Sequence, residues 1–498
     1  MRIFLLNSGP REYQQPKYRS LNFFWATLSA LVILLSACST NKQQKNNQPN
    51  PFTQYLSDVD PNYEYHTEQT KETPNYTTYT LKMTSQTWLR AEQTQDTLWW
   101  HWLTIVVPRE VKYQTALLWI GGGSARDSLP PEPQPLAIKA AMETNSVTAY
   151  LHNVPYQPIT FNEQGETPRI EDAIIAYGWD KFLRSGADDD SAEWLSRLPM
   201  TAAAQRAMDT VTEVVESNTP NTVDTFMTAG ASKRGWTTWT TAIFDDRVVA
   251  IAPAVIDLLN IKPSFRHHWR AYGEWSPAVD DYVEEDIMKW QYSQEFNRLL
   301  ELVDPYSYLD SLKIPKYIIN AANDEFFLPD SWQFYWDDLP GNKALRYIPN
   351  TGHDISGTDA LENLISFYEL ILRGEPIPDF TWKVTGKSFV LRMNKEALPD
   401  SLRLWKAKNS NARDFRLYVV DKNWSSSHLS LPEDGQTTIE LQKPADGTGY
   451  EAWFVEAIYT TSTGRQFKQT TGVKVLPDRY PYEPYNPKDS LGTIVRKS

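Results

Sequence analysis

The fold is decided by the stretch Thr225-Phe226-Met227-Thr228-Ala229-Gly230-Ala231-Ser232-Lys233-Arg234-Gly235-Trp236. Its first five residues form a short, mostly apolar run, which predicts a buried strand. Gly230 and the small residues around Ser232 permit a tight turn that lifts a hydroxyl above a sheet, and a helix is predicted to open directly after it. A serine presented between a strand and a helix in this way is a candidate nucleophile.

Short apolar runs and helix-like stretches alternate before and after this turn. The clearest helix is predicted over residues 359–372, where apolar side chains fall on one face. Such alternation is typical of a mostly parallel sheet covered by helices on both faces, so the predicted fold class is α/β. Reactive groups in such sheets gather at the carboxyl ends of the strands. Further strands are predicted at residues 117–120, 147–151, 248–251, 317–320 and 345–348.

Two other predicted strand ends carry residues that complete a catalytic set with Ser232. Asp324 follows one apolar strand, and His353 follows the next. Serine needs a base to take its proton, and the base needs a carboxylate to fix its tautomer. We therefore predict a triad of Ser232, Asp324 and His353, which stand in the chain order of the α/β-hydrolases. Asp257, at the end of another strand, is the alternative acid.

The oxyanion of a tetrahedral intermediate needs hydrogen-bond donors. One predicted donor is the backbone N–H of Lys233, the residue after the nucleophile. The other is predicted in the glycine turn after the strand that ends at Ile120, at Gly122 or Gly123, because glycine permits close backbone approach. The alternative is that this glycine run is an ordinary turn.

Three motifs resemble the PhoPQ-activated pathogenicity-related proteins. They are GASKRGWTTW at residues 230–239, VIDLLN at 255–260 and WLSRLPMT at 194–201. The resemblance extends from about Tyr76 to the C-terminal domain. It implies an α/β-hydrolase fold and a secreted or envelope location, and it suggests a link to envelope stress or virulence.

The predicted nucleophile turn departs from the common Gly-x-Ser-x-Gly pattern. Arg234 occupies the place of the second glycine, and Gly235 follows one residue later. A similar Gly-x-Ser-x-x-Gly turn occurs in glucuronoyl esterases. Arg234 is therefore a candidate for binding a substrate carboxylate, and the alternative is that it pairs with a neighbouring acid.

The N-terminus is predicted to be a targeting segment. Residues 1–37 combine basic residues, an apolar stretch and small residues before Cys38, which is typical of a secretory signal peptide. Leu35-Ser36-Ala37-Cys38 resembles the bacterial lipobox, which implies that Cys38 is lipidated and becomes the mature N-terminus. Ser39 after it favours the outer membrane. Residues 38–60 are predicted to be a polar tether.

The rest of the chain divides into two predicted domains. The hydrolase domain covers residues 61–373, with insertions at about 155–208 and 260–305 that would shape a lid. Proline and glycine near residue 374 precede short alternating segments, which predict a small all-β sandwich over 380–476 that acts as a packing module. One of these predicted strands covers residues 415–420. The tail, 477–498, is predicted to be irregular.

Composition excludes several classes of function. The net charge of −13 argues against nucleic acid as a partner, which would need a basic face. A single cysteine excludes an intrachain disulfide and multi-cysteine metal sites. Neither Asp188-Asp189-Asp190 nor His267-His268 has the spacing of a metal site, so we expect no metal or cofactor.

These observations predict a serine hydrolase of ester or amide bonds that works through an acyl-enzyme. The expected partners are a small-molecule or peptide/glycan ester substrate, and the membrane through lipidated Cys38. The alternative is an envelope scaffold or binding lipoprotein on a hydrolase fold that has lost activity. The sequence does not separate a carbohydrate esterase from a peptidase or a β-lactam amidase.

Overall fold

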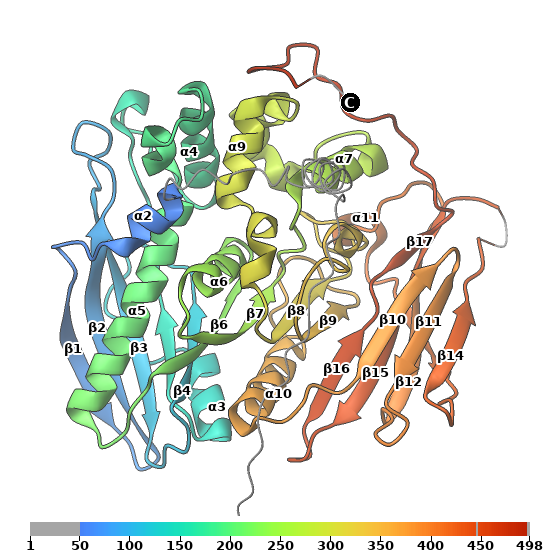
Figure 1. Cartoon of the computed structure of the whole chain (residues 1–498), viewed down its shortest axis with the longest axis horizontal. Coiled ribbons are helices and arrows are strands. Elements are labelled where there is room, and N and C mark those ends of the chain that lie inside the picture. The colour runs from blue at the N-terminus through green and yellow to red at the C-terminus, as the bar shows by residue number, and fades with distance from the viewer. Residues whose placement is uncertain (1–49, 445–446, 496–498) are drawn as a thin grey trace, which may run out of the picture. The chain divides into compact units, whose positions relative to one another are not determined.

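The computed structural model describes residues 50–444 and 447–495. The predictions made for residues 1–49, including the signal peptide and Cys38, lie outside the described residues. From Asn50 onward the chain forms one compact unit (Figure 1).

That unit begins inside the segment predicted as a tether. Helix α2 spans Pro51–Ser57, and the Asn50 side chain caps it by accepting from the Phe52 N–H. Phe52 is fully buried and stacks on Phe244, with 4.5 Å between the ring centroids. The prediction of a tether up to residue 60 is therefore corrected, because the buried Phe52 ring anchors residues 50–57 to the core.

The centre of the molecule is a nine-stranded sheet with the order β1-β2-β3-β5-β4-β6-β7-β8-β9. Strands β5, β4, β6, β7, β8 and β9 pair in parallel, whereas β1, β2 and β3 form an antiparallel edge. The strands are β1 (Glu64–Glu72), β2 (Tyr76–Thr87), β3 (Leu98–Pro108), β4 (Thr115–Ile120), β5 (Thr148–Leu151), β6 (Thr225–Ala231), β7 (Val248–Ala254), β8 (Lys316–Ala321) and β9 (Lys343–Ile348).

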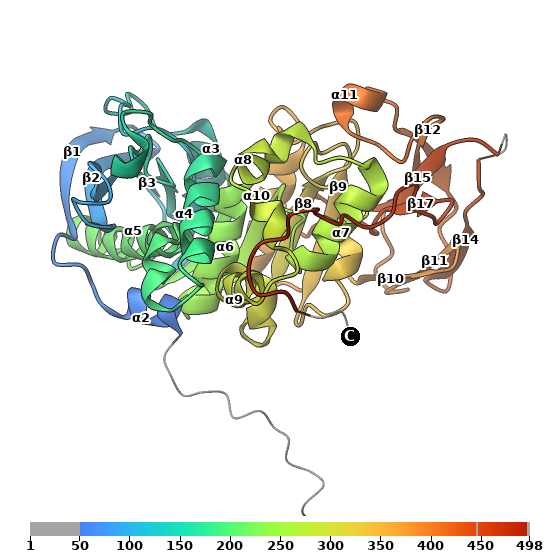
Figure 2. The ribbon, with the colours of Figure 1, turned by 90° about the horizontal axis from the view of Figure 1, so that it is seen from above.

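Helices cover both faces of this sheet (Figures 1 and 2). Leu118 and Phe226 face the cluster that includes α5 (Arg197–Asn218) and α6 (Lys233–Phe244). Their neighbours Leu117 and Met227 face the opposite cluster, with α3 (Pro135–Thr144) and α10 (Ala360–Arg373). The alternation follows from the two-residue period of a strand. The prediction of an α/β-hydrolase fold with a mostly parallel sheet is confirmed.

Further helices gather over the carboxyl ends of the parallel strands, at the top of Figure 1. They are α4 (Asp172–Arg184), α7 (Ile261–Tyr272), α8 (Asp280–Glu284) and α9 (Gln294–Val303). All four come from the two insertions predicted in the sequence.

Two small antiparallel sheets follow the hydrolase part. One has the order β10-β11-β14, and the other has the order β13-β12-β15-β16, with β17 also paired to β15. Residues 415–420, predicted as a strand, instead contain the short helix α11 (Leu417–Val420), because the Leu417 N–H donates to the Asn323 carbonyl at the end of β8. The strands are β10 (Phe380–Thr385), β11 (Ser388–Met393), β12 (Ser401–Asn409), β13 (Ser425–Leu429), β14 (Gln436–Glu440), β15 (Tyr450–Thr460), β16 (Gln466–Thr470) and β17 (Lys474–Leu476).

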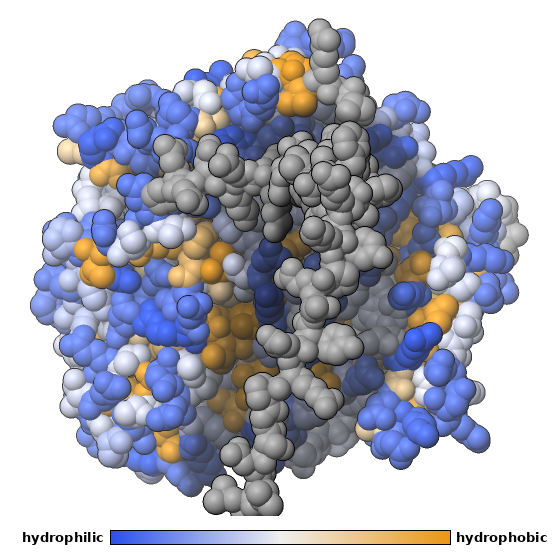
Figure 3. All heavy atoms as spheres, in the orientation of Figure 1, coloured by the Kyte–Doolittle hydropathy of each residue, from blue (hydrophilic) through white to orange (hydrophobic). Residues whose placement is uncertain are grey.

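One face of the molecule is drawn in Figure 3. On the face shown in Figure 3, hydrophilic side chains dominate and the hydrophobic patches among them are small. Among the described residues, no helix combines the length and the apolar character that crossing a bilayer requires.

Candidate active site

Ser232 occupies a strained turn between β6 and α6. Its backbone has φ 58° and ψ −127°, a conformation that costs energy in a non-glycine residue. The Ser232 N–H donates to the Ala254 carbonyl at 2.8 Å, which ties the turn to β7. A Cβ on Gly230 would lie 2.7 Å from the Arg234 carbonyl oxygen, and one on Gly235 would lie 2.8 Å from the Ile256 side chain. The two glycines therefore allow the close packing that holds this turn.

His353 and Asp324 form an ion pair at the ends of neighbouring strands. Nδ1 of His353 lies 2.9 Å from Oδ2 of Asp324 and 3.1 Å from its Oδ1. The backbone N–H groups of Phe326 and Phe327 donate to Oδ1 of Asp324 at 2.8 and 3.3 Å, so the turn after β8 fixes the carboxylate. The pairing directs Nδ1 toward the acid and leaves Nε2 as the other ring nitrogen.

The second nitrogen of His353 is available to a reacting group. Nε2 is buried and has no hydrogen-bond partner among the described residues. The Ser232 hydroxyl likewise has no hydrogen bond to another described residue. The His353 ring packs on Phe326, with 4.3 Å between centroids, and Phe326 lines the same pocket as Ser232.

The electrostatics of His353 favour its protonated form. Burial lowers the pKa of the imidazole, but the charge of Asp324 and its hydrogen bond outweigh burial. The neighbouring cation Lys233 also lowers it and Glu325 raises it, and the net result is a pKa above the ordinary value.

Glu325 anchors the loop that carries His353. Its Oε2 accepts a hydrogen bond from the His353 backbone N–H at 2.7 Å. A Cβ on Gly352 would clash with the Glu325 carboxylate in this position, so glycine lets the carboxylate lie against the loop. Two adjacent acids thus hold His353 by different atoms: Asp324 by the ring and Glu325 by the backbone.

Asp257 serves a different group of residues. It is buried beneath the sheet end and accepts hydrogen bonds from the hydroxyls of Tyr335, at 2.6 Å, and Tyr347. Burial raises the pKa of Asp257 to about 7, against the opposing effect of these two hydrogen bonds. His353 forms its ion pair with Asp324 and not with Asp257.

The predicted oxyanion donors have unpaired backbone N–H groups. Lys233 is the first residue of α6, and Gly122 and Gly123 follow the end of β4. None of these three N–H groups has an acceptor in the described part of the chain. Gly123 has φ 144°, and a Cβ there would lie 3.1 Å from the Asn153 nitrogen, so this position requires glycine.

The side chains after the nucleophile join a buried ion network. Lys233 Nζ lies 2.8 Å from Glu171 Oε2 and 2.9 Å from Asp172 Oδ2. Arg234 Nη2 lies 2.6 Å from Glu171 Oε1, and its Nε donates to the Val154 carbonyl. Burial raises the pKa of Glu171, but Arg234 and Lys233 lower it to about 2. Of the two alternatives for Arg234, the structure has the pairing with a neighbouring acid, and contact with substrate stays a prediction.

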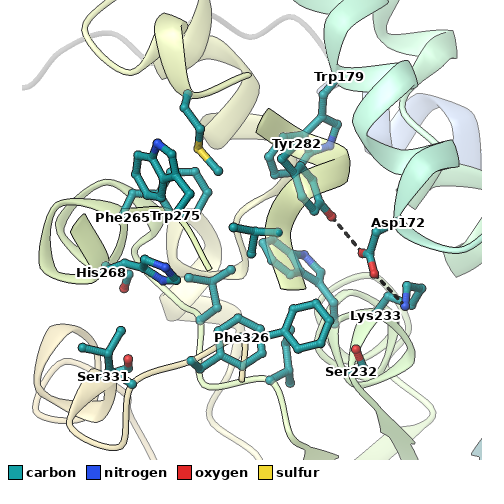
Figure 4. A pocket seen from close by; sticks show the side chains of 18 of the residues that line it. Asp172, Trp179, Ser232, Lys233, Phe265, His268, Trp275, Tyr282, Phe326 and Ser331 are labelled. Atoms are coloured by element: carbon teal, nitrogen blue, oxygen red, sulfur yellow. Dashed lines mark hydrogen bonds and ion pairs between the residues drawn. The ribbon is translucent and has the colours of Figure 1, made fainter. Parts of the chain in front are cut away.

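A pocket opens beside Ser232 (Figure 4). It encloses about 720 Å³, open solvent at its mouth included. Its walls come from both insertions and from the turn after β8, and most of them are aromatic or aliphatic. Trp179, Phe265, Trp275, Tyr282 and Phe326 surround the space in Figure 4. Such a pocket suits an apolar group held next to the nucleophile.

The candidate metal positions are engaged in other contacts. Asp188 Oδ1 accepts a hydrogen bond from the Ser191 N–H, and Asp189 pairs with Arg298. His267 bonds Asp330, whereas His268 lines the pocket. Among residues 50–444 and 447–495, no group of three potential ligands has the geometry to hold a metal ion.

Comparison with known proteins identifies the family. Residues 52–416 match the family model described as PhoPQ-activated pathogenicity-related protein. This chain belongs to the PhoPQ-related family. Autocrine proliferation repressor protein A of Dictyostelium discoideum is 34% identical over 462 residues, which is 87% of this chain and 91% of that protein. The resemblance inferred from the three motifs is confirmed.

Solved structures similar to this PhoPQ-related chain are more distant. Acetyl xylan esterase 1 from Thermoanaerobacterium sp. has a TM-score of 0.45 and 14% identity, over 65% of this chain and 92% of that one. The glucuronoyl esterase from Solibacter usitatus has a TM-score of 0.38 and 10% identity, over 62% and 85%. The Pyrococcus horikoshii acylaminoacyl peptidase has a TM-score of 0.34 and 11% identity, over 64% and 51%.

The PhoPQ-related segment also contains site residues that the sequence analysis missed. Glu171 and Asp172 hold the Lys233 side chain, Glu325 holds the His353 loop, and Arg197 lines the pocket. Two adjacent acids directly before an apolar helix, and a second acid directly after Asp324, were the signals available. Arg197 lay inside a quoted motif, but nothing in its spacing indicated that it is buried.

Proposed function

We propose that this PhoPQ-related protein is a serine hydrolase of ester or amide bonds, with Ser232 as nucleophile, His353 as base and Asp324 as the acid that orients it. The observation that carries the proposal is the hydrogen bonding of the two ring nitrogens of His353. Its Nδ1 is held by Asp324 at 2.9 Å, while its buried Nε2 has no partner in the described part of the chain. A buried nitrogen left unpaired costs free energy, and a catalytic base is a reason for a protein to keep one.

The reaction follows from these positions. Oγ of Ser232 attacks the substrate carbonyl carbon while Nε2 of His353 takes the hydroxyl proton. The oxyanion accepts hydrogen bonds from the Lys233 N–H and from the N–H of Gly122 or Gly123. The intermediate collapses, the C–O or C–N bond breaks, and His353 returns its proton to the leaving group. Water then hydrolyses the acyl-enzyme by the same steps.

The strained backbone of Ser232 supports this role. Non-glycine residues with positive φ persist only where the surrounding structure enforces them, and they cluster at functional sites. Here the tie to Ala254 and the close packing of Gly230 and Gly235 enforce the strain. The proposed steps need no metal or cofactor.

A panel of substrates tests the proposal. Purified protein is assayed with p-nitrophenyl esters, aminoacyl amides and glucuronate esters, beside the variant Ser232→Ala. Hydrolysis of at least one class by the wild-type protein, lost in the variant, is the expected result. The class that reacts also separates carbohydrate esterase from peptidase or amidase.

We further propose that the protein is a lipoprotein of the bacterial envelope, with the outer membrane as its destination. The support is the sequence Leu35-Ser36-Ala37-Cys38 after a basic and apolar segment. Metabolic labelling with an alkyne fatty acid should tag the wild-type chain and not Cys38→Ser. Membrane fractionation of the two forms then reports whether the proposed anchor determines location.

A second candidate is a non-catalytic binding protein on the same fold. The observation in its favour is that the 34% identical relative is named as a repressor of proliferation and not as an enzyme. Under this candidate, Ser232→Ala would leave the effect of the protein on cells unchanged. Under the hydrolase proposal, the same variant would lose every cellular effect that depends on hydrolysis.

A further inference from the structure

Arg197 is a buried cation at the wall of the Ser232 pocket. It begins helix α5, and only 2% of the residue is exposed. Its Nη1 donates to the Lys233 carbonyl at 2.8 Å, and its guanidinium lies over the Trp236 ring, 4.5 Å from the centroid. These two contacts hold the guanidinium against Lys233, which follows the nucleophile Ser232 in the chain.

No carboxylate of the described residues forms an ion pair with this guanidinium, and the charge of the more distant Asp172 only partly offsets the effect of burial on its pKa. Within the described part of the chain, no acidic oxygen lies within 4.0 Å of its nitrogens, and its Nε is buried without a hydrogen-bond partner. Burial lowers the pKa of Arg197 to about 10, so the side chain stays charged at neutral pH. A buried and unpaired charge is costly, which calls for a ligand that compensates it.

The acids nearest the nucleophile turn form their ion pairs with Lys233 and Arg234 and not with Arg197. Lys233 and Arg234 are matched by Glu171 and Asp172. Asp172 accepts from Lys233 and from the Tyr282 hydroxyl, at 3.0 Å, so both its oxygens are engaged (Figure 4). Neither oxygen of Asp172 is therefore free to pair with Arg197.

The arrangement of the free hydrogen-bond donors around the pocket favours a carboxylate as the bound anion. The contact of Nη1 with the Lys233 carbonyl leaves the Nε edge of the fork unpaired. A guanidinium edge binds the two oxygens of a carboxylate in a bidentate way. Trp179, which also lines the pocket, has a buried Nε1 without a partner in the same part of the chain, so it offers one more donor and no acceptor. Most of the other lining side chains are apolar or aromatic, and the polar ones include Asp172, Lys233 and His268.

We propose that Arg197 binds a carboxylate of the substrate, so that the pocket takes an aromatic or branched apolar group that carries a carboxylate next to the scissile bond. This inference rests on the proposed hydrolase function and names its substrate class: esters or amides of carboxylate-bearing, largely apolar molecules.

The test compares two ligands that differ in charge and little in shape. Isothermal titration calorimetry measures the binding of 1-naphthylacetate and 1-naphthylacetamide to the wild-type protein. The acid is expected to bind at least tenfold more tightly than the amide. In Arg197→Gln, which removes the charge, the two affinities become equal. Arg197→Lys, which keeps the charge, retains part of the preference.

Arg206→Gln is the matched control, because Arg206 lies on the same helix and pairs with Asp209 away from the pocket. It should keep the full preference for the acid. Circular dichroism and thermal unfolding check that each variant folds. If Arg197→Gln does not fold, the test rests on the affinities of the acid and the amide for the wild-type protein and for Arg197→Lys.

Labelling of Ser232 by a neutral fluorophosphonate, measured in parallel, separates the two proposals. A preference for the acid without labelling retains the subsite and overturns the hydrolase. Labelling together with equal affinities, or with no binding of either ligand, retains the hydrolase and overturns the carboxylate subsite.

Discussion

Asn350 and Trp424 exchange two hydrogen bonds. Nδ2 of Asn350 donates to the Trp424 carbonyl at 2.9 Å, and the Trp424 N–H donates to Oδ1 of Asn350 at 2.8 Å. Asn350 stands three residues before His353 in a left-handed conformation, with φ 60°. The segment before β13 in the C-terminal part thus holds the loop that carries the proposed base. A second tie, from Asn323 Nδ2 to the Phe415 carbonyl at 2.7 Å, holds the turn before Asp324.

Removing the Asn350 side chain should loosen His353. Asn350→Gly keeps the left-handed backbone accessible and removes both hydrogen bonds, so stability should fall by about 1–3 kcal/mol. We expect kcat to fall several-fold with little change in KM, because the base is misplaced and the pocket is not. Asn145→Gly, at another left-handed position after α3, is the control and should leave kcat unchanged. Equal kcat values for Asn350→Gly and wild type would refute this role.

Deleting all residues after Gly374 should destabilise the whole hydrolase part. Arg346 in β9 pairs with Glu456 in β15, and both side chains are only 3% exposed. Truncation leaves Arg346 without this partner, and breaking a buried pair costs about 3–5 kcal/mol. Thermal unfolding of the truncated chain measures the loss. A truncated chain with the wild-type midpoint and lost affinity for a glycan would show that the C-terminal sheets are a binding module.

The pH dependence of kcat/KM should report His353. Only the neutral imidazole accepts the serine proton, so the rate rises with pH through the pKa of His353 in the free protein. Asp324 raises that pKa above the ordinary value of about 6.5, and the midpoint should lie above it. In Asp324→Asn the residual activity should have a lower midpoint. A midpoint that rises or stays in this variant would contradict the electrostatic account.

The choice of acid can be tested with two matched variants. Asp324→Asn should reduce kcat by about 10⁴-fold, as expected when the imidazole takes the wrong tautomer, while the fold persists. Asp257→Asn should reduce kcat far less, since Asp257 bonds Tyr335 and Tyr347 and not the base. Steady-state kinetics on both proteins decides. The reverse order of effects would assign the acid to Asp257 and leave Ser232 and His353 in place.

The elements that are strongly periodic were predictable from the sequence. The apolar strand before Ser232 and the amphipathic helix that the structure places at Ala360–Arg373 both follow from local patterns. The positions of Ser232, Asp324 and His353 at strand ends followed from the same patterns, since a parallel sheet brings its carboxyl ends together.

The rest depends on contacts between distant residues. Residues 415–420 look like a strand, yet the bond from Leu417 to the Asn323 carbonyl folds part of them into a helix. Arg197 lies 35 residues before Ser232, and only the packing of α5 on α6 shows that it is a buried cation at the pocket. Residues 50–57 are predicted as part of a polar tether over 38–60, but the burial of Phe52 attaches them to the folded core.

The central claim is that Ser232 is an activated nucleophile. Incubating the folded protein with a fluorophosphonate probe, followed by intact and peptide mass spectrometry, tests it directly. The account predicts one probe adduct per chain, located on Ser232, no adduct in Ser232→Ala, and much slower labelling in His353→Ala. A folded wild-type protein that takes up no probe, or takes it up equally after Ser232→Ala, would contradict it.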